Sequence, residues 1–311
     1  MKLKEFSAPI SAYWDLPENR ENRDRPPFSS EKMGSVPIFS RICKELIDIK
    51  ILNLNLLDHG PSISEECLGI LEALKEAHMS ISLTVPASAL DGQLISRLEG
   101  LNVRALFVTA GPLDDLRSSL DIIKRHRSAG LSFGISFSVN RDNYTDLPEV
   151  LTLCLDSGMD YLVIPMQRLM EEGECFYITP KEREGLELKL RGIDKPERLR
   201  IIINDPFLWS AFFPETQYPE CGCQAANSML YISRALEVYP CAAMPVKLGD
   251  LGKTTLKEII SSADKSEFRR LINMTPEGCR DCKKLPQCLG GCRGRTYALE
   301  GSVNGPDPAC G

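Results

Sequence analysis

The C-terminal part of the chain, from residue 279 to residue 310, reads CRDCKKLPQCLGGCRGRTYALEGSVNGPDPAC. Its five cysteines have the spacing Cys279-x2-Cys282-x5-Cys288-x3-Cys292, and 17 residues separate Cys292 from Cys310. A C-x2-C turn lets two thiolates of one loop reach neighbouring irons of a [4Fe–4S] cluster. Four thiolates also hold structural zinc, usually from two such knuckles, and only one C-x2-C knuckle exists here. The spacing therefore favours iron–sulfur and leaves zinc as the alternative.

The cysteines are unevenly distributed along the 311 residues. Four of the 12 cysteines lie before residue 220, namely Cys43, Cys67, Cys154 and Cys175. The other eight are Cys221, Cys223, Cys241, Cys279, Cys282, Cys288, Cys292 and Cys310. The N-terminal sequence shows no apolar segment of the signal-peptide type, so we expect a cytoplasmic protein with reduced thiols. Clustered reduced cysteines are typical metal ligands, whereas the four scattered ones are typical of buried free thiols.

Composition excludes several classes of function. Lys and Arg number 37 against 43 Asp and Glu, a net charge of −6 without a basic block, so non-specific nucleic-acid binding is not expected. An 18-residue apolar run is also missing, so no membrane span is expected.

Residues 8–205 alternate between short apolar runs and amphipathic stretches. The expected strands are 10–14, 51–57, 80–85, 103–108, 132–138, 161–165 and 200–203, and the expected helices are 36–48, 64–78, 90–99, 113–129, 145–157 and 180–191. This alternation predicts right-handed βαβ units and a parallel sheet. The fold class is α/β, with a partial barrel favoured and a doubly wound sheet as the alternative. No strand is followed by G-x-G-x-x-G or a P-loop.

Two stretches interrupt this alternation. The charged and proline-rich stretch from Asp15 to Pro27 follows the first strand, and we interpret it as a solvated loop. Its position matters because loops at the C-terminal ends of barrel strands carry the chemistry. The second stretch, Pro206–Pro219, contains five aromatic residues and three prolines. We expect an aromatic loop that packs between two domains, with a wall for a bound peptide or a cover over a metal centre as the alternative.

The cysteine pattern resembles the seven-cysteine signature of the SPASM domain, which follows the barrel in many radical SAM enzymes that modify peptides. The flanking text is similar too, in LEVYPCAAMPVKLGDLGKTTLKEI from residue 236 and LGGCRGRTYALEGSVNGPDPAC from residue 289. One departure is that Leu236 stands where the signature has glycine, which puts a turn in doubt. The resemblance implies domains at 1–205 and 220–311, joined by an aromatic linker at 206–219.

The same resemblance implies two auxiliary [4Fe–4S] clusters. The ligands of one would be Cys279, Cys282, Cys288 and Cys310. The ligands of the other would be Cys223, Cys241 and Cys292, with Cys221 as the local candidate for the fourth.

A radical SAM enzyme also needs C-x3-C-x2-C after its first strand, to bind a third cluster with an open iron. The stretch from Asp15 to Pro27 contains no cysteine, and the loop expected to read G-G-E-P reads LDHGP at 57–61. We therefore expect a degenerate barrel without SAM cleavage. The two loops should face the same end of the barrel and form a vestigial pocket there.

The whole chain resembles the SPASM-domain companion of the GeoRSP peptide-modification system. That resemblance implies three partners: a radical SAM/SPASM enzyme, a PqqD-like peptide-binding protein and a ribosomal peptide substrate. The implied role is electron transfer or scaffolding, with no catalytic residue. Two alternatives remain, an enzyme that uses an open-coordinated auxiliary cluster without SAM and a structural zinc-binding domain.

Overall fold

The computed structural model describes residues 5–16, 35–110, 113–127, 130–169, 175–216, 218 and 222–311. Within these residues one ten-stranded sheet has the order β10-β9-β8-β1-β2-β3-β4-β5-β6-β7. Its strands are β1 (Ser11–Asp15), β2 (Asn53–Leu57), β3 (Ser80–Pro86), β4 (Val103–Ala110), β5 (Ser132–Phe137), β6 (Tyr161–Ile164), β7 (Arg200–Ile203), β8 (Met229–Ile232), β9 (Glu237–Tyr239) and β10 (Gly249–Asp250).

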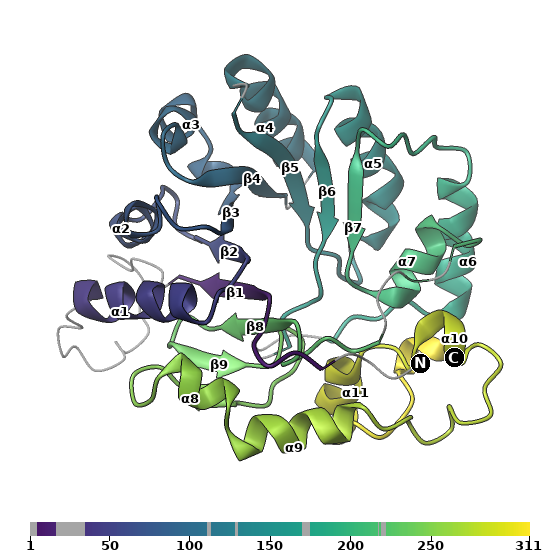
Figure 1. The fold of residues 1–311 in the computed structure, drawn as a ribbon. Coiled ribbons are helices and arrows are strands. Elements are labelled where there is room, and N and C mark those ends of the chain that lie inside the picture. The colour runs from purple at the N-terminus through teal and green to yellow at the C-terminus, as the bar shows by residue number, and fades with distance from the viewer. Residues whose placement is uncertain are drawn as a thin grey trace, which may run out of the picture.

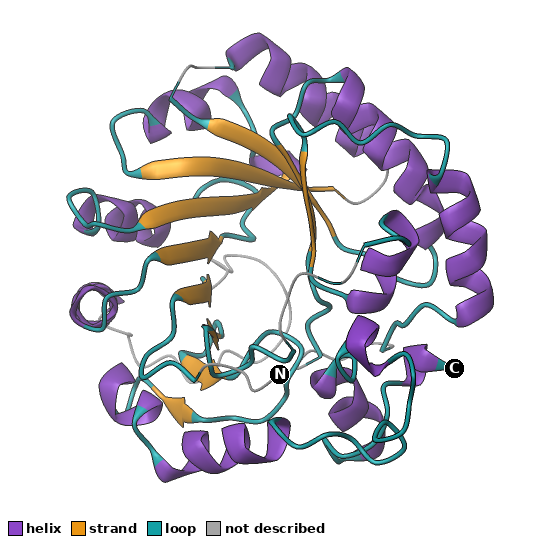
Figure 2. Ribbon diagram, turned by 45° about the vertical axis from the view of Figure 1, so that its right-hand side comes forward, coloured by secondary structure: helices purple, strands orange, loops and turns teal. Residues whose placement is uncertain are grey.

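Strands β1 to β7 run parallel in sequence order, and β8 pairs in parallel with β1. The helices of this part are α1 (Ser35–Asp48), α2 (Glu65–Ala73), α3 (Gly92–Leu98), α4 (Leu113–His126), α5 (Leu147–Asp156), α6 (Pro180–Leu190) and α7 (Pro206–Phe212), with 3-10 turns η1 (Ala87–Ala89) and η2 (Tyr144–Asp146). Helices α1 to α6 lie outside the curved sheet (Figures 1 and 2). A doubly wound sheet would carry helices on both faces, so the partial barrel is confirmed.

The expected strands and helices of residues 8–205 are all present, with ends that shift by a few residues. The largest shift is in α2, which ends at Ala73 rather than at residue 78. The side chains of Trp14, Phe133 and Phe137 are among the largest that are fully buried, and they belong to one continuous apolar core. Burial of this surface, at about 25 cal/mol per Å², holds the helices on the sheet.

The stretch Pro206–Pro219, expected as a loop, begins with helix α7. Asp205 caps this helix by accepting hydrogen bonds from the N–H groups of Phe207 (2.8 Å) and Leu208 (3.1 Å). Pro206 at the first helical position suits the start of a helix, because its fixed φ matches and no N–H is needed there. The expectation was wrong because aromatic residues, whose rings here pack on one another, give little helical signal in so short a stretch.

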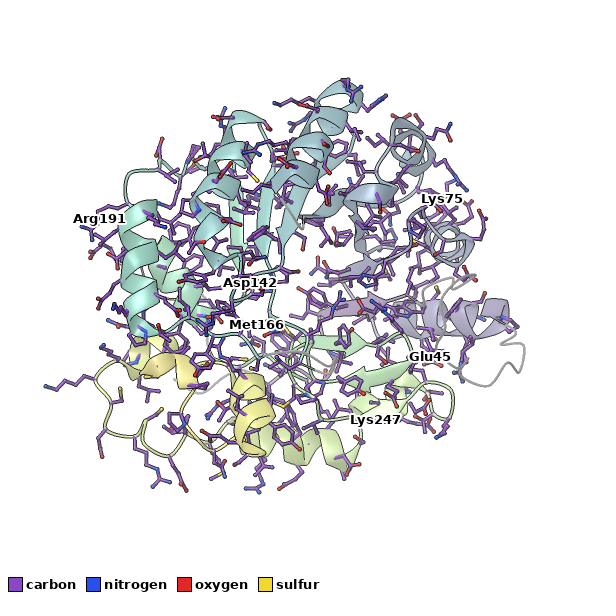
Figure 3. The ribbon with its side chains drawn as sticks, turned by 180° about the vertical axis from the view of Figure 1, so that it is seen from behind. Glu45, Lys75, Asp142, Met166, Arg191 and Lys247 are labelled. Atoms are coloured by element: carbon purple, nitrogen blue, oxygen red, sulfur yellow. The ribbon has the colours of Figure 1, made fainter. Side chains whose placement is uncertain are left out.

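The C-terminal region contains β8, β9, β10 and further helices. These are α8 (Leu256–Ile260), α9 (Ala263–Ile272), α10 (Leu285–Cys288), α11 (Arg293–Glu300) and the 3-10 turn η3 (Pro308–Cys310). Figure 1 shows α10 and α11 in yellow near α6 and α7. On the other side of the region, Glu45 of α1 accepts a hydrogen bond from the N–H of Leu256 (2.6 Å), and Glu45 lies on the side where Lys247 is seen in Figure 3.

The N-terminal segment also contacts this region, because Arg269 of α9 forms a two-pronged ion pair with Glu5. The C-terminal region is therefore attached to the barrel at several places along its length. Among the described residues, no helix has the length and apolar character needed to cross a membrane.

Candidate iron–sulfur sites

The first cysteine group consists of Cys223, Cys241 and Cys292, which come from three separate segments. Cys223 precedes β8, Cys241 follows β9, and Cys292 is the N-cap of α11. The hairpin of β8 and β9 brings the first two segments together, and the N–H of Ala226 donates to the carbonyl of Pro240 (2.9 Å). The third segment must be brought in by the packing of α11.

Helix α11 approaches the loop after Cys241 very closely. A Cβ at Gly294 would lie 1.9 Å from the carbonyl oxygen of Ala243, a distance that no real side chain can occupy. Glycine at this position therefore lets the start of α11, with Cys292, lie against the Cys241 loop.

Electrostatic interactions show that the three thiols of the first group are neighbours. Burial raises the pKa of Cys241, and the thiols of Cys223 and Cys292 raise it further. Burial likewise raises the pKa of Cys292 to about 12, with Asp307 and Cys223 adding to the rise and Arg295 opposing it. The three thiols therefore lie within electrostatic range of one another, and their convergence on one cluster stays a prediction.

The second cysteine group consists of Cys279, Cys282, Cys288 and Cys310. A tight turn holds the first two, with the N–H of Cys282 donating to the carbonyl of Cys279 (3.2 Å). Cys288 is the last residue of α10, and Cys310 ends η3. Three of these thiols are thus placed by one short loop and helix, and the fourth is placed by the end of the chain described here.

The four thiols of the second group also interact with one another. Burial is the largest cause that raises the pKa of Cys279, and the thiols of Cys288, Cys310 and Cys282 raise it further. The Arg293 guanidinium lowers this pKa. Burial also raises the pKa of Cys310, and the thiols of Cys288 and Cys282 raise it further. The thiols of Cys279 and Cys310 thus interact with Cys288 and Cys282, whereas Cys292 interacts with Cys223 and Cys241, as the predicted assignment requires.

A buried charge network joins the two groups to the barrel, centred on Arg295 with 3% of its side chain exposed. Arg295 donates to both oxygens of Asp307, Nε to Oδ1 at 2.9 Å and Nη2 to Oδ2 at 2.7 Å, and Nη1 donates to Asp205. Asp307 Oδ2 accepts the N–H of Cys292 (2.6 Å), and Oδ1 accepts the N–H of Ala309 beside Cys310 (2.9 Å).

Asp205 and Arg295 also line a small cavity where the barrel meets the C-terminal region. Met166, which lines the same cavity, is labelled at this junction in Figure 3. The cavity and the network place the end of β7 next to both cysteine groups.

The donor set of each group fits a thiolate-bound cluster. Cysteine sulfur is the ligand that iron–sulfur clusters use, and hydrogen bonds to sulfur together with nearby charge tune them. Here the N–H of Arg295 donates to Cys292 Sγ (3.4 Å), and the guanidinium groups of Arg293 and Arg295 lie near the thiols. Within the described chain, no three or more His, Cys, Asp or Glu side chains are arranged to hold a single metal ion.

The remaining cysteines fall into two cases. Cys221 lies outside the described residues. Cys43, Cys67 and Cys154 are buried in the core, where burial raises the pKa of Cys43 and of Cys154 to about 12, and Cys175 is half-buried. No disulfide joins any two of the eleven described cysteines.

A second polar cluster lies at the barrel end formed by the C-termini of the strands. Asp15, the fully buried last residue of β1, has its Oδ1 3.0 Å from Arg168 Nη2 and 3.4 Å from His59 Nε2. The hydroxyl of Tyr231 on β8 donates to Oδ2. We call these four residues the Asp15 network.

Charge pairing dominates the state of Asp15. Burial by itself raises the pKa of Asp15, but the interactions with His59, the Arg168 guanidinium and the Tyr231 hydroxyl outweigh burial and hold that pKa below its usual value. The carboxylate therefore stays ionised at neutral pH.

The Asp15 network tests part of the expected vestigial pocket. Contact between Asp15 and His59 shows that the loops after β1 and β2 begin at the same end of the barrel, whereas residues 17–27 lie outside the described chain. Arg168 and Tyr231 were missed, and the one available signal was that Arg168 follows the expected strand 161–165 in a strand-end loop.

Comparisons with known proteins agree with this geometry. Residues 221–283 match the SPASM family, described as an iron–sulfur cluster-binding domain. The chain is 22% identical over 289 residues to the PqqA peptide cyclase of Granulibacter bethesdensis, covering 87% of this chain and 77% of that protein. It is 26% identical over 214 residues to the AdoMet-dependent heme synthase of Oleidesulfovibrio alaskensis, covering 59% and 52%.

Solved structures are similar over nearly the whole chain. Streptococcus suis SuiB bound to S-adenosylmethionine has a TM-score of 0.68 at 17% identity, covering 98% of this chain and 76% of SuiB. The anSMEcpe structure with bound AdoMet has a TM-score of 0.63 at 16% identity, covering 97% and 91%. At such identities the likeness establishes the fold.

The molecule thus has the fold of the radical SAM/SPASM enzymes, with a partial parallel β/α barrel and a cysteine-rich C-terminal part. That C-terminal part contains a SPASM domain, the iron–sulfur cluster-binding module of this class.

Proposed function

We propose that this protein carries two [4Fe–4S] clusters and acts as an electron-transfer or scaffolding companion in radical-based peptide modification, without cleaving SAM itself. The second cysteine group holds one cluster. The first group holds the other, with Cys221 as its fourth ligand. The observation that carries the proposal is the contrast between two convergent cysteine groups and a loop after β1 that contains no cysteine.

The Asp15 network supports the absence of radical SAM chemistry. A catalytic cluster of this class needs three thiolates in the loop after the first strand, and the chain has none between Asp15 and Cys43. At the end of β1 stands a buried carboxylate that is already paired with Arg168 and His59. Its charge is complementary to those side chains and unfavourable for an anionic cluster at the same place.

When bound, the clusters supply one-electron oxidation and reduction. The chain's own residues hold and orient the thiols: Asp307 fixes the backbone on both sides through Cys292 and Ala309, and Arg295 ties Asp307 to the barrel. No described residue needs to move a proton for this role.

The partner that we propose is a radical SAM/SPASM enzyme, together with a PqqD-like peptide-binding protein and a ribosomal peptide. Two similarities support this class of partner. The chain is similar to PqqA peptide cyclases, and one structural neighbour is SuiB bound to its precursor peptide SuiA.

Anaerobic purification with iron, sulfide and zinc analysis tests the clusters. About eight irons and eight sulfides per chain are expected, since each cluster has four of each. Zinc without sulfide would refute the iron–sulfur proposal and support a structural zinc domain.

The companion role has its own test. The reduced, cluster-loaded protein is incubated with SAM, and 5′-deoxyadenosine is measured against a cluster-free control. We expect no turnover, and turnover above the control would show that the chain is itself a radical SAM enzyme. Co-purification with the cognate radical SAM enzyme tests association, and Cys292→Ala should then alter peptide modification by the pair.

An enzyme with an open auxiliary iron is the second candidate, and it requires that Cys221 is not a ligand of the first group. Cyanide added to the reduced protein distinguishes the two. An altered electron paramagnetic resonance signal in the wild-type chain indicates an open iron, whereas alteration only in Cys221→Ala indicates that Cys221 is the fourth ligand.

A further inference from the structure

Arg293 is a buried cation to which the described residues offer no carboxylate at ion-pair distance. It is the first residue of α11, directly after Cys292, and only 4% of it is exposed. Its guanidinium donates to two backbone carbonyls, from Nη1 to Val303 (2.9 Å) and from Nη2 to Met274 (2.6 Å). Among the described residues, no Asp or Glu oxygen lies within 4.0 Å of the Arg293 guanidinium, the distance that defines an ion pair.

Arg295, two residues further along the same helix, is a buried cation whose charge is balanced by carboxylates. It meets Asp307 through two hydrogen bonds and Asp205 through a third. The contrast matters because a buried charge that is offset only by neutral carbonyls is unfavourable unless an anion lies nearby.

Thiols of both cysteine groups are among the ionisable groups that interact electrostatically with Arg293. It interacts electrostatically with Cys223 and Cys292 of the first group and with Cys279 of the second, and with Asp307 beyond ion-pair distance. The effect is mutual, because the charge of Arg293 acts on Cys279 as well. Geometry places the guanidinium near both groups, because a Cβ at Gly290, which stands between Cys288 of the second group and Cys292 of the first, would lie 3.6 Å from Arg293 Nη2.

We propose that Arg293 is an electrostatic positioning residue shared by the two clusters, which raises the reduction potential of both. The inference rests on the proposed function, since it requires that both cysteine groups hold clusters. A thiolate-bound [4Fe–4S] cluster is anionic and gains a further negative charge when it is reduced. A buried cation beside it stabilises the reduced form more than the oxidised form, so reduction becomes easier.

A shared cation would shift both potentials in the same direction, so loss of its charge should lower both. In the competing, structural explanation, the guanidinium only ties α11 to the carbonyls of Met274 and Val303. The two explanations differ in whether the charge or the hydrogen bonds matter.

The experiment is a redox titration of the loaded full-length protein, followed by electron paramagnetic resonance, with iron and sulfide measured for every sample. Arg293→Met removes the charge. We expect both potentials to fall by at least the equivalent of a tenfold change in the reduction equilibrium, which is about 59 mV for one electron. Arg280→Met is the matched control, because Arg280 is exposed between two cysteines of the second group, where solvent screens its charge.

Two further variants keep the test decisive if Arg293→Met loads poorly. Arg293→Lys retains the charge and should keep both potentials near those of the wild type, whereas Arg293→Gln retains donors without charge and should lower both. Equal potentials in Lys and Gln variants, or a shift in only one cluster, would overturn the shared role. Wild-type protein without iron and sulfide would instead overturn the proposed function itself.

Discussion

Asp15 is a buried carboxylate whose pKa is set by the charged and polar side chains around it. A carboxylate with no exposed surface is expected to become neutral, yet the pKa of Asp15 is lowered because Arg168, His59 and Tyr231 surround it. Such a group contributes to stability only while it is charged.

We therefore predict that Asp15→Asn lowers the free energy of unfolding by about 1–3 kcal/mol at pH 7, since it leaves Arg168 facing a neutral amide. Because the folded pKa lies below the unfolded value near 3.9, the contribution is present above that pH and is lost as pH falls through the folded pKa. Urea unfolding from pH 7 down to pH 3 measures it. Asp156→Asn, at an exposed helix end, should change stability by less than about 0.5 kcal/mol. A wild-type advantage that persists unchanged at pH 3 would contradict the prediction.

Leu236 occupies the position where the SPASM signature has glycine, and the backbone still forms a turn there, in which the N–H of Leu236 donates to the carbonyl of Ser233. Its φ is +62°, in the left-handed region, while the side chain is 4% exposed in the core. The leucine thus combines backbone strain with apolar burial.

Replacing Leu236 should reverse the usual order of alanine and glycine. Leu236→Ala loses the buried side chain and keeps the strain, for a cost of about 2–5 kcal/mol. Leu236→Gly loses the same side chain but relieves the strain, so it should be less destabilised by about 1 kcal/mol. Chemical denaturation of both variants gives the comparison, and a glycine variant less stable than the alanine variant would disprove this account.

Among the elements, α11 determines which thiols meet. Its first turn carries Cys292, Arg293, Gly294 and Arg295, so one helix start contributes a cysteine, two buried cations and the closest backbone contact of the site. Gly291, just before it, has a φ of +70° and lies against Asp307. The helix can be placed only if these residues all fit.

We predict that Gly294→Ala destabilises the protein and selectively empties the first cysteine group, because the new Cβ would collide with the backbone at Ala243. Iron per chain should fall to that of one cluster while the second cluster's spectrum persists. Gly185→Ala in α6 is the control, since a Cβ there meets nothing within 4 Å, and it should be neutral or stabilising by up to about 1 kcal/mol. Full iron content in Gly294→Ala would show that the loop yields and would refute this role.

On the scale of the whole molecule, the barrel and the C-terminal region differ in what stabilises them. The barrel buries a continuous apolar core, whereas the described C-terminal residues from 273 onward contain short helices and turns around the thiols. Under the proposed function, bound clusters stabilise only the folded state, so we expect the region around the thiols to depend on them.

Removal of the clusters by an anaerobic chelator should therefore loosen the C-terminal region first. We expect hydrogen exchange to rise in residues 273–310 and 222–244, while strands β2 to β6 remain protected. Reloading with iron and sulfide should restore protection. Equal loss of protection across the barrel would show that the clusters support the entire fold.

The sequence by itself determined the architecture and the character of the C-terminal part. Apolar runs of strand length alternating with amphipathic stretches specify parallel βα units, because side-chain period and burial are properties of neighbouring residues. The cysteine spacing indicated metal binding for a similar reason, since a C-x2-C turn such as the one at Cys279 and Cys282 is closed locally.

Only the tertiary structure decided which distant residues meet. It placed Tyr231 beside Asp15 across 216 residues and turned an expected aromatic loop into α7. It also gave Arg295 two carboxylate partners, whereas Arg293 has none among the described residues. Such pairings depend on how elements pack in three dimensions, and residue periodicity along the chain carries no record of them.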